Sequence, residues 1–311
     1  MLGLQVGGCE SGQYALSPQG DATQYQFRTS PAGTNLRSHQ SRHYVILYSG
    51  DEASARQTGR FLDQVYSRFM QSFSQAGFAP KAPGNKLVCV VLSSYQELDA
   101  YGREADATET SWMDGYYSFR TNRIAFVQPR GGGDLARTDV PATPHQAGLY
   151  ATPSGASSGG LNLRTATHEL AHQLAFNSGI QAPGAAYPFW VSEGLATNFE
   201  AGDRDRGGLG QKACVYRGRL VDVKRGGRLI ALERFATMTS VPGRASGVTR
   251  DAYAQAWGLF QYLSQRRPRE FRQYLAMFSG GQSQRGAFVA AFGPVASVER
   301  QFHQFIDQQT R

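Results

Sequence analysis

The segment His168-Glu169-Leu170-Ala171-His172 decides how the rest of the chain is interpreted. Two histidines four residues apart lie one turn apart on the same face of an α-helix, so both imidazole rings can reach one metal ion. The carboxylate of Glu169 would face the open side of that metal, where it can accept a proton from a bound water molecule. These five residues therefore predict a helix that carries a metal site.

A third ligand is predicted in the segment Trp190-Val191-Ser192-Glu193-Gly194-Leu195-Ala196. A catalytic zinc needs three protein ligands and one position for water, and Glu193 supplies the ligand that is missing. Asn177, Ser178 and Gly179 are expected to end the first helix, because glycine readily adopts the left-handed cap conformation. Proline and glycine at 183–188 then separate it from a second helix near Trp190. We expect this helix–turn–helix to bring Glu193 beside the histidines and to bind one zinc per chain.

The combined pattern, His-Glu-x-x-His followed by Trp-x-x-Glu-Gly-Leu-Ala, resembles the gluzincin group of zinc metallopeptidases over residues 168–200. A looser likeness in layout, from about residue 43 to 279, is closest to uncharacterised bacterial gluzincin-like domains. The resemblance implies an α+β, zincin-like fold in which a mixed-sheet subdomain and a mainly helical subdomain enclose zinc in the cleft between them. It also implies hydrolysis of peptide bonds by a zinc-activated water, with Glu169 as the base.

Three departures from the aminopeptidase members of that group bear on the reaction. Ser192 stands where asparagine is usual, and Leu195 where an aromatic residue is usual. The Gly-x-Met-Glu-Asn segment that anchors the free amine of a substrate in that family does not occur upstream. We therefore expect an endopeptidase.

Tyr253 is the candidate donor to the oxyanion that forms during hydrolysis. It opens the helical stretch Asp251–Phe260, downstream of the ligands, where similar gluzincins place their transition-state tyrosine. The alternative is that Tyr253 and Trp257, at positions i and i+4, are two aromatic residues on a buried helix face.

Two other functions agree with the same residues. One is a catalytically inactive zincin-fold protein that serves as a binding or scaffold protein of the cell envelope, with Glu169 no longer taking part in turnover. The other is a cell-envelope factor whose basic surface binds anionic polymer and whose metal is only structural. Steep loss of affinity with added salt would support the latter.

Composition and charge narrow the classes of partner. The chain has 311 residues, of which 41% are hydrophobic and 18% charged, which is typical of a soluble globular protein of one or two domains. No apolar run reaches the length of a membrane-spanning helix. The net charge of +8 favours anionic surroundings such as nucleic acid, phospholipid or cell-wall polymer and does not choose among them. The expected partners are a peptide or protein substrate and an anionic cell-envelope surface. Seven basic residues in 212–234 alternate with glycine and aliphatic residues, which predicts a solvated surface and no specific nucleic-acid site.

The cysteines and the remaining histidines give weaker signals. Val6-Gly7-Gly8-Cys9 resembles the cleavage site of a bacterial lipoprotein, although the eight preceding residues are too few for a signal peptide. We expect export, either to the periplasm, to the medium or to a lipid anchor at Cys9, unless that match is accidental. Cys89 is expected to be a small buried hydrophobe, and Cys214 has no clear interpretation. His145 is expected to be a solvated loop residue, and His39, His43 and His303 to be structural or exposed.

The chain divides into four parts by its patterns. Residues 1–40 predict a flexible lead-in, 41–129 an α/β sheet subdomain, 130–163 a loop rich in Gly, Pro and Ser, and 164–311 the zinc-site and helical subdomain. The loop at 130–163 precedes the metal helix and could cover the cleft.

Within the sheet subdomain, strands are expected at 43–48 and 87–92, with a long helix between them that Gly77 follows. A capping box at Ser94 should open a short helix that Gly102 closes. A hairpin around Thr121-Asn122 should join strands at 115–119 and 124–127. The resemblance to zincin folds implies that strand 124–128, which precedes the metal helix, forms a free sheet edge. That edge would either pair with an extended substrate or be protected by Arg123 and Pro129. In the C-terminal half, helices are expected at 228–239, 251–265, 268–278 and 297–308.

Overall fold

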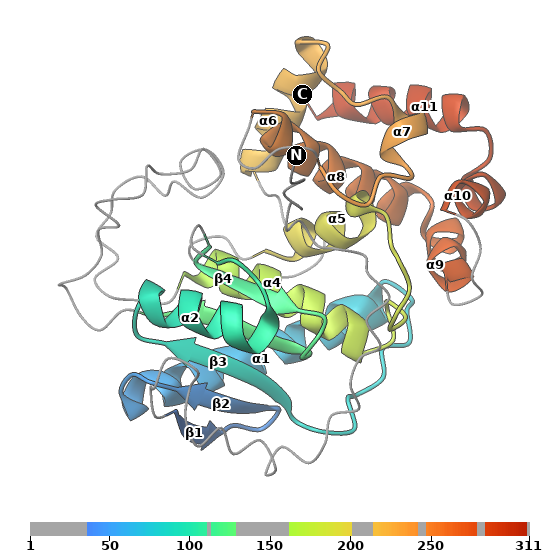
Figure 1. The fold of residues 1–311 in the computed structure, drawn as a ribbon. Helices are drawn as coiled ribbons and strands as arrows, with labels where there is room; N and C mark the ends of the chain where they lie inside the picture. The colour runs from blue at the N-terminus through green and yellow to red at the C-terminus, as the bar shows by residue number, and fades with distance from the viewer. Residues whose placement is uncertain are drawn as a thin grey trace.

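The computed structural model describes residues 36–110, 113–128, 162–200, 214–241, 247–278 and 284–309 (Figure 1). These residues form a mixed α+β protein with a five-stranded sheet and helices, as the sequence predicts. Cys9, His145, most of the predicted lead-in and nearly all of the predicted loop at 130–163 lie outside the described residues.

The sheet has the strand order β1-β2-β3-β5-β4. Its three inner strands are parallel, and an antiparallel strand lies at each edge. The predicted strands are confirmed as β2 (Tyr44–Tyr48), β3 (Leu87–Leu92), β4 (Gly115–Ser118) and β5 (Arg123–Val127). The flexible lead-in was predicted too long, because Arg37–Gln40 pair with β2 as strand β1.

The predicted free edge at 124–128 is wrong, because β5 lies between β3 and β4. Ile124 is opposite Cys89 of β3 on one side and opposite Tyr117 of β4 on the other. Ile124, Ala125 and Phe126 are all buried and apolar, which suits a strand that is covered on both faces. Within this hairpin, β5 is therefore the inner strand and β4 is the edge strand of the sheet.

Helices cover both faces of this sheet. On one face, Tyr44, Ile46 and Tyr48 of β2 share a core with α1 (Glu52–Gln75) and α4 (Leu163–Asn177). On the other face, Val45 and Leu47 share a smaller core with α2 (Tyr95–Asp106). The alternation along β2 follows from the pleat of a strand, which points successive side chains to opposite faces.

Helix α2 begins as predicted but does not end at Gly102. The Ser94 hydroxyl accepts a hydrogen bond from the Glu97 backbone N–H at 3.2 Å, and the helix continues to Asp106. A Cβ at position 102 would lie 2.6 Å from the Thr110 Cγ2 and 2.9 Å from the Thr108 carbonyl oxygen. Gly102 thus permits a close approach of the following segment instead of terminating the helix.

The C-terminal half is helical, with α4 and α5 lying between the sheet and the other helices (Figure 1). The structure has α5 (Phe189–Phe199), α6 (Cys214–Arg225), α7 (Leu232–Phe235), α8 (Gly247–Arg266), α9 (Pro268–Met277), α10 (Gln284–Phe292) and α11 (Val295–Gln308). The sequence patterns did not predict α6 and α10. None of the described helices is long and apolar enough to cross a membrane.

The helix predicted at 228–239 is wrong over most of its length, since only α7 forms there. The Gln255 side chain explains the difference. Its Oε1 accepts from the Ile230 N–H at 2.9 Å, and its Nε2 donates to the Ile230 carbonyl at 2.7 Å. A long-range partner thus takes the Ile230 carbonyl, which the predicted helix would have used, and tertiary contacts override the local pattern.

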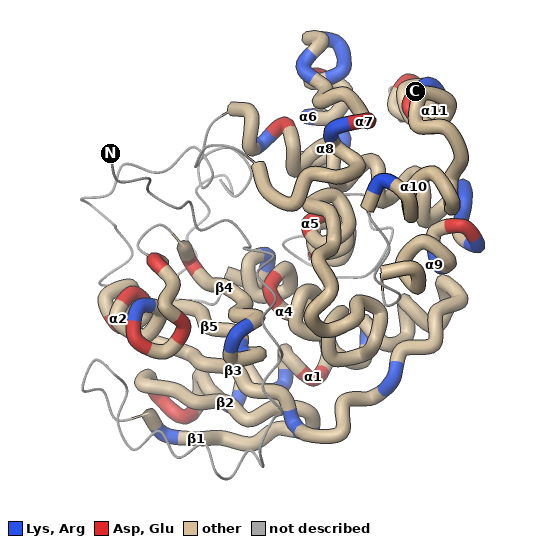
Figure 2. The backbone as a smooth tube through the Cα atoms, turned by 45° about the vertical axis from the view of Figure 1, so that its right-hand side comes forward, with Lys and Arg blue, Asp and Glu red and all other residues tan. Residues whose placement is uncertain are grey.

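Basic residues are distributed over the sheet part and the C-terminal helices (Figure 2). Several of those in 212–234 pair within the protein. Arg219 and Arg228 both contact the carboxylate of Asp251, at 2.6 and 2.9 Å, and Lys224 contacts Asp307. Part of the basic segment thereby holds α6 and the chain after it to α8 and α11.

Candidate metal centre

The metal ligands predicted from the sequence lie on α4 and α5. The Asn162 side chain accepts from the Thr165 N–H and caps the start of α4. Gly179 follows its end in the left-handed conformation, with φ +76°, as predicted. The chain then turns, and α5 begins after Pro188. The cap at Asn162 and the breaks at Gly179 and Pro188 thus give two adjacent helices, whose polar side chains meet in an apolar surrounding.

Gly194 sets the distance between α5 and α8. A Cβ at this position would lie 2.7 Å from both the Ala256 carbonyl oxygen and the Phe260 Cβ. Real side chains do not approach backbone so closely, so only glycine permits this packing. The glycine beside Glu193 therefore brings α8, and Tyr253 with it, against the metal helices.

His168, His172 and Glu193 form a buried group that could hold a metal ion. The two Nε2 atoms are 3.2 Å apart. The Glu193 carboxylate lies 3.2 Å from His168 Nε2 and 3.7 Å from His172 Nε2. The side chains of all three residues thus point their donor atoms at one place, although they come from two helices.

The spacing of these donors fits a tetrahedral ion. Nitrogen and oxygen ligands about 2.0–2.2 Å from zinc lie roughly 3.3–3.6 Å from one another in tetrahedral geometry. The two histidine Nε2 atoms are 3.2 Å apart, close to that range. The Glu193 contacts of 3.2 and 3.7 Å are made by its two different oxygens, and one donor atom from each of the three residues lies within 4.8 Å of the other two. No fourth His, Cys, Asp or Glu belongs to the group within the described parts of the chain. The donor set and its dimensions therefore suit a metal that keeps one position for another ligand.

Glu200, at the end of α5, supports the first histidine and was missed in the sequence. Its Oε1 lies 2.8 Å from His168 Nδ1. The Tyr216 hydroxyl donates to both Glu200 oxygens, at 2.8 and 3.1 Å, and Arg164 Nε lies 3.9 Å away. A carboxylate at Nδ1 keeps a proton on that nitrogen and directs the Nε2 lone pair to the metal. The missed signal is the spacing, since Glu200 follows Glu193 by two helical turns on the same face.

Burial and neighbouring charges determine the pKa values in this group. Burial lowers the pKa of His168, but its hydrogen bonds to Glu193 and Glu200 outweigh burial and raise that pKa well above the usual value. Burial likewise raises the pKa of Glu193, yet the two histidines outweigh it and hold that pKa well below its ordinary range. Glu193 is thus held as an anion, the state in which a carboxylate binds metal.

Glu169 lies beside the ligands and is fixed to the edge of the sheet. Its Oε2 accepts from the Tyr117 backbone N–H of β4 at 2.8 Å. In the β4–β5 ladder, Val127 N–H donates to the Asp114 carbonyl, so the residue pair Tyr117–Ile124 is of the non-hydrogen-bonded type. The Tyr117 N–H therefore points away from β5, to the free edge. Burial raises the pKa of Glu169, although His168 and His172 oppose that rise.

Tyr253 lies beside the metal group, as the sequence interpretation requires. Its ring centroid is 6.5 Å from that of His168 and 5.1 Å from that of Phe189. Trp257, one turn further on, is buried and stacks at 6.4 Å on Tyr216. Trp257 thus packs in the core against the tyrosine that contacts Glu200. Tyr253, by contrast, is partly buried next to a candidate ligand.

The remaining histidines and cysteines predicted as structural take no part in this group. His43 stacks on Tyr66 at 3.8 Å. Cys89 is buried in β3, and burial raises the pKa of its thiol well above the usual value, which agrees with the predicted inert, hydrophobe-like role. The side chain of Cys214 lies outside the described residues.

Comparison with known families places one match on this part of the chain. The model of a family described as "Protein of unknown function (DUF1570)" matches residues 162–283. That range begins at the N-cap of α4 and includes the two metal helices, Tyr216 and Tyr253. No curated protein matches the sequence.

Proposed function

We propose that this protein is a zinc-dependent metallopeptidase that cleaves peptide bonds within extended polypeptide segments. One observation carries the proposal. The donor atoms of His168, His172 and Glu193 converge to within 4.8 Å of one another, and the carboxylate of Glu169 lies beside them, fixed by a backbone N–H. The resemblance of residues 168–200 to gluzincins supports the same assignment.

Zinc is the metal that this donor set suits best. Two imidazole nitrogens and one carboxylate oxygen are the ligands of a known class of catalytic zinc sites. When bound, zinc would polarise a substrate carbonyl and lower the pKa of a coordinated water. Neutral histidines and an ionised carboxylate are needed for binding, and the Glu200 contact at Nδ1 of His168 leaves Nε2 available.

Glu169 is the general base in this proposal. Burial brings its pKa upward toward the working pH, where a carboxylate can both accept and return a proton. The Tyr117 N–H holds one carboxylate oxygen at 2.8 Å, so the other oxygen stays available for proton transfer. Tyr253 is the proposed donor to the oxyanion, because it approaches the group from α8, with its ring 6.5 Å from that of His168.

The edge strand β4 is the proposed binding strand for the substrate. The outward-pointing backbone groups of β4 belong to Gly115 and Tyr117, the residues of its non-hydrogen-bonded pairs, and of these the Tyr117 N–H is already bound to Glu169. An extended peptide added at this edge would run past Glu169, which contacts the same strand. Binding through backbone groups requires no free terminus, which agrees with endopeptidase action.

The test is zinc content combined with peptide hydrolysis. Protein purified without chelator should contain about one zinc per chain, and Glu193→Ala should lose it. Glu169→Gln should keep the zinc but lose hydrolysis of a peptide library by about 10²–10⁴-fold, the usual contribution of a general base.

The outcomes separate the rival functions. A wild-type protein that binds zinc but cleaves no peptide would support the inactive zincin-fold scaffold of the cell envelope. A wild-type protein that binds no zinc after loading would overturn the metallopeptidase proposal.

A further inference from the structure

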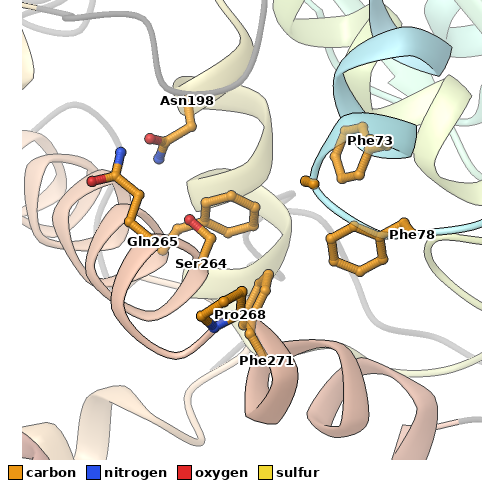
Figure 3. A pocket seen from close by; sticks show the side chains of 9 residues that line it. Phe73, Phe78, Asn198, Ser264, Gln265, Pro268 and Phe271 are labelled. Carbon is orange, nitrogen blue, oxygen red and sulfur yellow. The ribbon is translucent and has the colours of Figure 1, made fainter.

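A second site lies on the opposite side of α5 from the metal ligands. A pocket of about 200 Å³ opens between the end of α1, helix α5 and the elbow that joins α8 to α9 (Figure 3). It is lined by Phe73, Ala76, Phe78, Asn198, Phe260, Ser264, Gln265, Pro268 and Phe271. Exposed Ala76 and Gln265 lie at its mouth, while Phe73, Phe260 and Phe271 are buried.

Phenyl rings dominate the walls. Phe73 and Phe78 meet edge to face with centroids 5.4 Å apart, and Phe260 and Phe271 do so at 5.0 Å. The Phe78 and Phe271 centroids, from the two sides of the pocket, are 6.3 Å apart. Such walls offer both ring faces and ring edges, which favour another aromatic ring over an aliphatic chain.

Asn198 supplies polar atoms to the lining of the pocket. The residue is 3% exposed, and its Nδ2 donates to the Gly194 and Trp257 carbonyls at 2.7 and 2.9 Å. None of the described residues donates to its Oδ1. Ser264 nearby gives its hydroxyl proton to the Gln261 carbonyl at 3.3 Å, so its oxygen also remains an acceptor. Asn198 Oδ1 is not among the fully buried unpaired polar atoms of the described residues, so it is open to solvent from the pocket. A ligand that brings one O–H or N–H could replace that solvent contact with a hydrogen bond.

We propose that this pocket binds a neutral, single-ring aromatic group that carries a hydroxyl, that is, a phenol. Size supports one ring, since a cavity of about 150 Å³ with similar lining holds benzene. Charge supports a neutral ligand, because no lining residue is acidic or basic. The hydroxyl donates to Asn198 Oδ1 while the ring packs among the four phenylalanines. A free phenol and the tyrosine side chain of a peptide share this chemistry.

The site is independent of the proposed peptidase chemistry. Asn198 differs from Glu193 by five helical positions and from Glu200 by two, so it projects from another side of α5. Phenol binding can therefore be tested, and shown to be right or wrong, whatever the outcome for zinc binding and hydrolysis.

The experiment is calorimetric titration of the full chain with p-cresol and with toluene. Toluene has the same ring and methyl group but no hydroxyl, and it is the more hydrophobic of the two. We expect p-cresol to bind about two- to tenfold more tightly, the net effect of one hydrogen bond. Asn198→Ala should reverse that preference. Equal or tighter binding of toluene to the wild type, or binding of neither, would overturn the proposal.

Because Asn198 also bonds to α8, a second variant guards against loss of folding. Gln265→Trp, at an exposed position on the mouth, should block p-cresol binding, whereas Gln273→Trp, exposed on α9 and outside the pocket, should not. Unchanged binding in Gln265→Trp would contradict the location. N-acetyl-tyrosinamide provides the last arm. Tighter binding than p-cresol assigns the site to a tyrosine side chain, and weaker binding assigns it to a free phenol.

Discussion

The two histidines of the metal centre come from one helix but have different surroundings. His168 has a carboxylate behind it, since Glu200 contacts its Nδ1 and Tyr216 in turn holds Glu200. His172 has none, because its Nδ1 is buried without a hydrogen-bond partner among the described residues. The Nδ1 side of one histidine is therefore held by a polar network, whereas among the described residues the Nδ1 side of the other is held only by packing. The difference teaches that the pattern of ligands in a sequence does not reveal how each ligand is held.

Replacing each histidine by alanine should give the largest effects and should separate the two surroundings. Both His168→Ala and His172→Ala should abolish tight metal binding, because each removes one of three protein ligands. Without metal, however, His168→Ala should be less stable than His172→Ala by about 1–3 kcal/mol, since it leaves the buried Glu200 carboxylate short of a partner. Urea unfolding of the two metal-free variants measures this difference. Equal stabilities would show that Glu200 does not depend on His168.

Glu200→Gln should weaken metal binding by about 10–100-fold, the usual effect of removing the outer partner of a ligand histidine. The amide keeps the shape of the side chain but loses the charge that stabilises the N–H of His168. Competition with a chromophoric chelator gives the affinity. Glu233→Gln, an exposed carboxylate that pairs with Arg285, is the matched control and should leave affinity unchanged. If the metal affinity of Glu200→Gln stayed within twofold of that of the wild type, the Glu200 network would not contribute to metal binding.

Tyr216→Phe should have a smaller effect, about two- to tenfold on metal affinity. The substitution removes one hydroxyl that donates to Glu200 but retains the ring that stacks on Trp257. The same chelator competition applies. A loss as large as that of Glu200→Gln would mean that Tyr216, and not the carboxylate alone, fixes the imidazole.

Arg164→Gln should have the smallest effect, less than about threefold. Its Nε lies 3.9 Å from Glu200 and its side chain is 22% exposed, so solvent screens the interaction. Raising the salt concentration should leave the Glu200→Gln effect intact and reduce the Arg164→Gln effect further. A large, salt-resistant loss in Arg164→Gln would show that the guanidinium belongs to the network.

The sequence predicted the class of fold and the metal group because both depend on local patterns. Helical spacing places His168 and His172 on one face. The end of α4 at Gly179 and the start of α5 after Pro188 can be predicted without tertiary information. The spacing of Glu200 from Glu193 could have placed it on the same face, but its contact with Tyr216 could not be predicted, since it forms only when α6 packs against the end of α5. The edge strand was misplaced for a related reason. The order of β4 and β5 depends on how the hairpin meets β3, and a strand pattern does not encode that order.

The contact between Glu169 and the Tyr117 N–H ties the proposed base to the main chain and not to a side chain. Tyr117→Phe, which keeps the N–H and the buried ring and loses only the hydroxyl bonded to Asn122, should thus leave the carboxylate where it is. A change in the length of the turn between β4 and β5 is another matter. A shift of one residue in the ladder would turn the outward N–H toward β5 and leave Glu169 without its donor. The alignment of two strands, more than the chemistry of any one of their residues, thereby determines where the base lies.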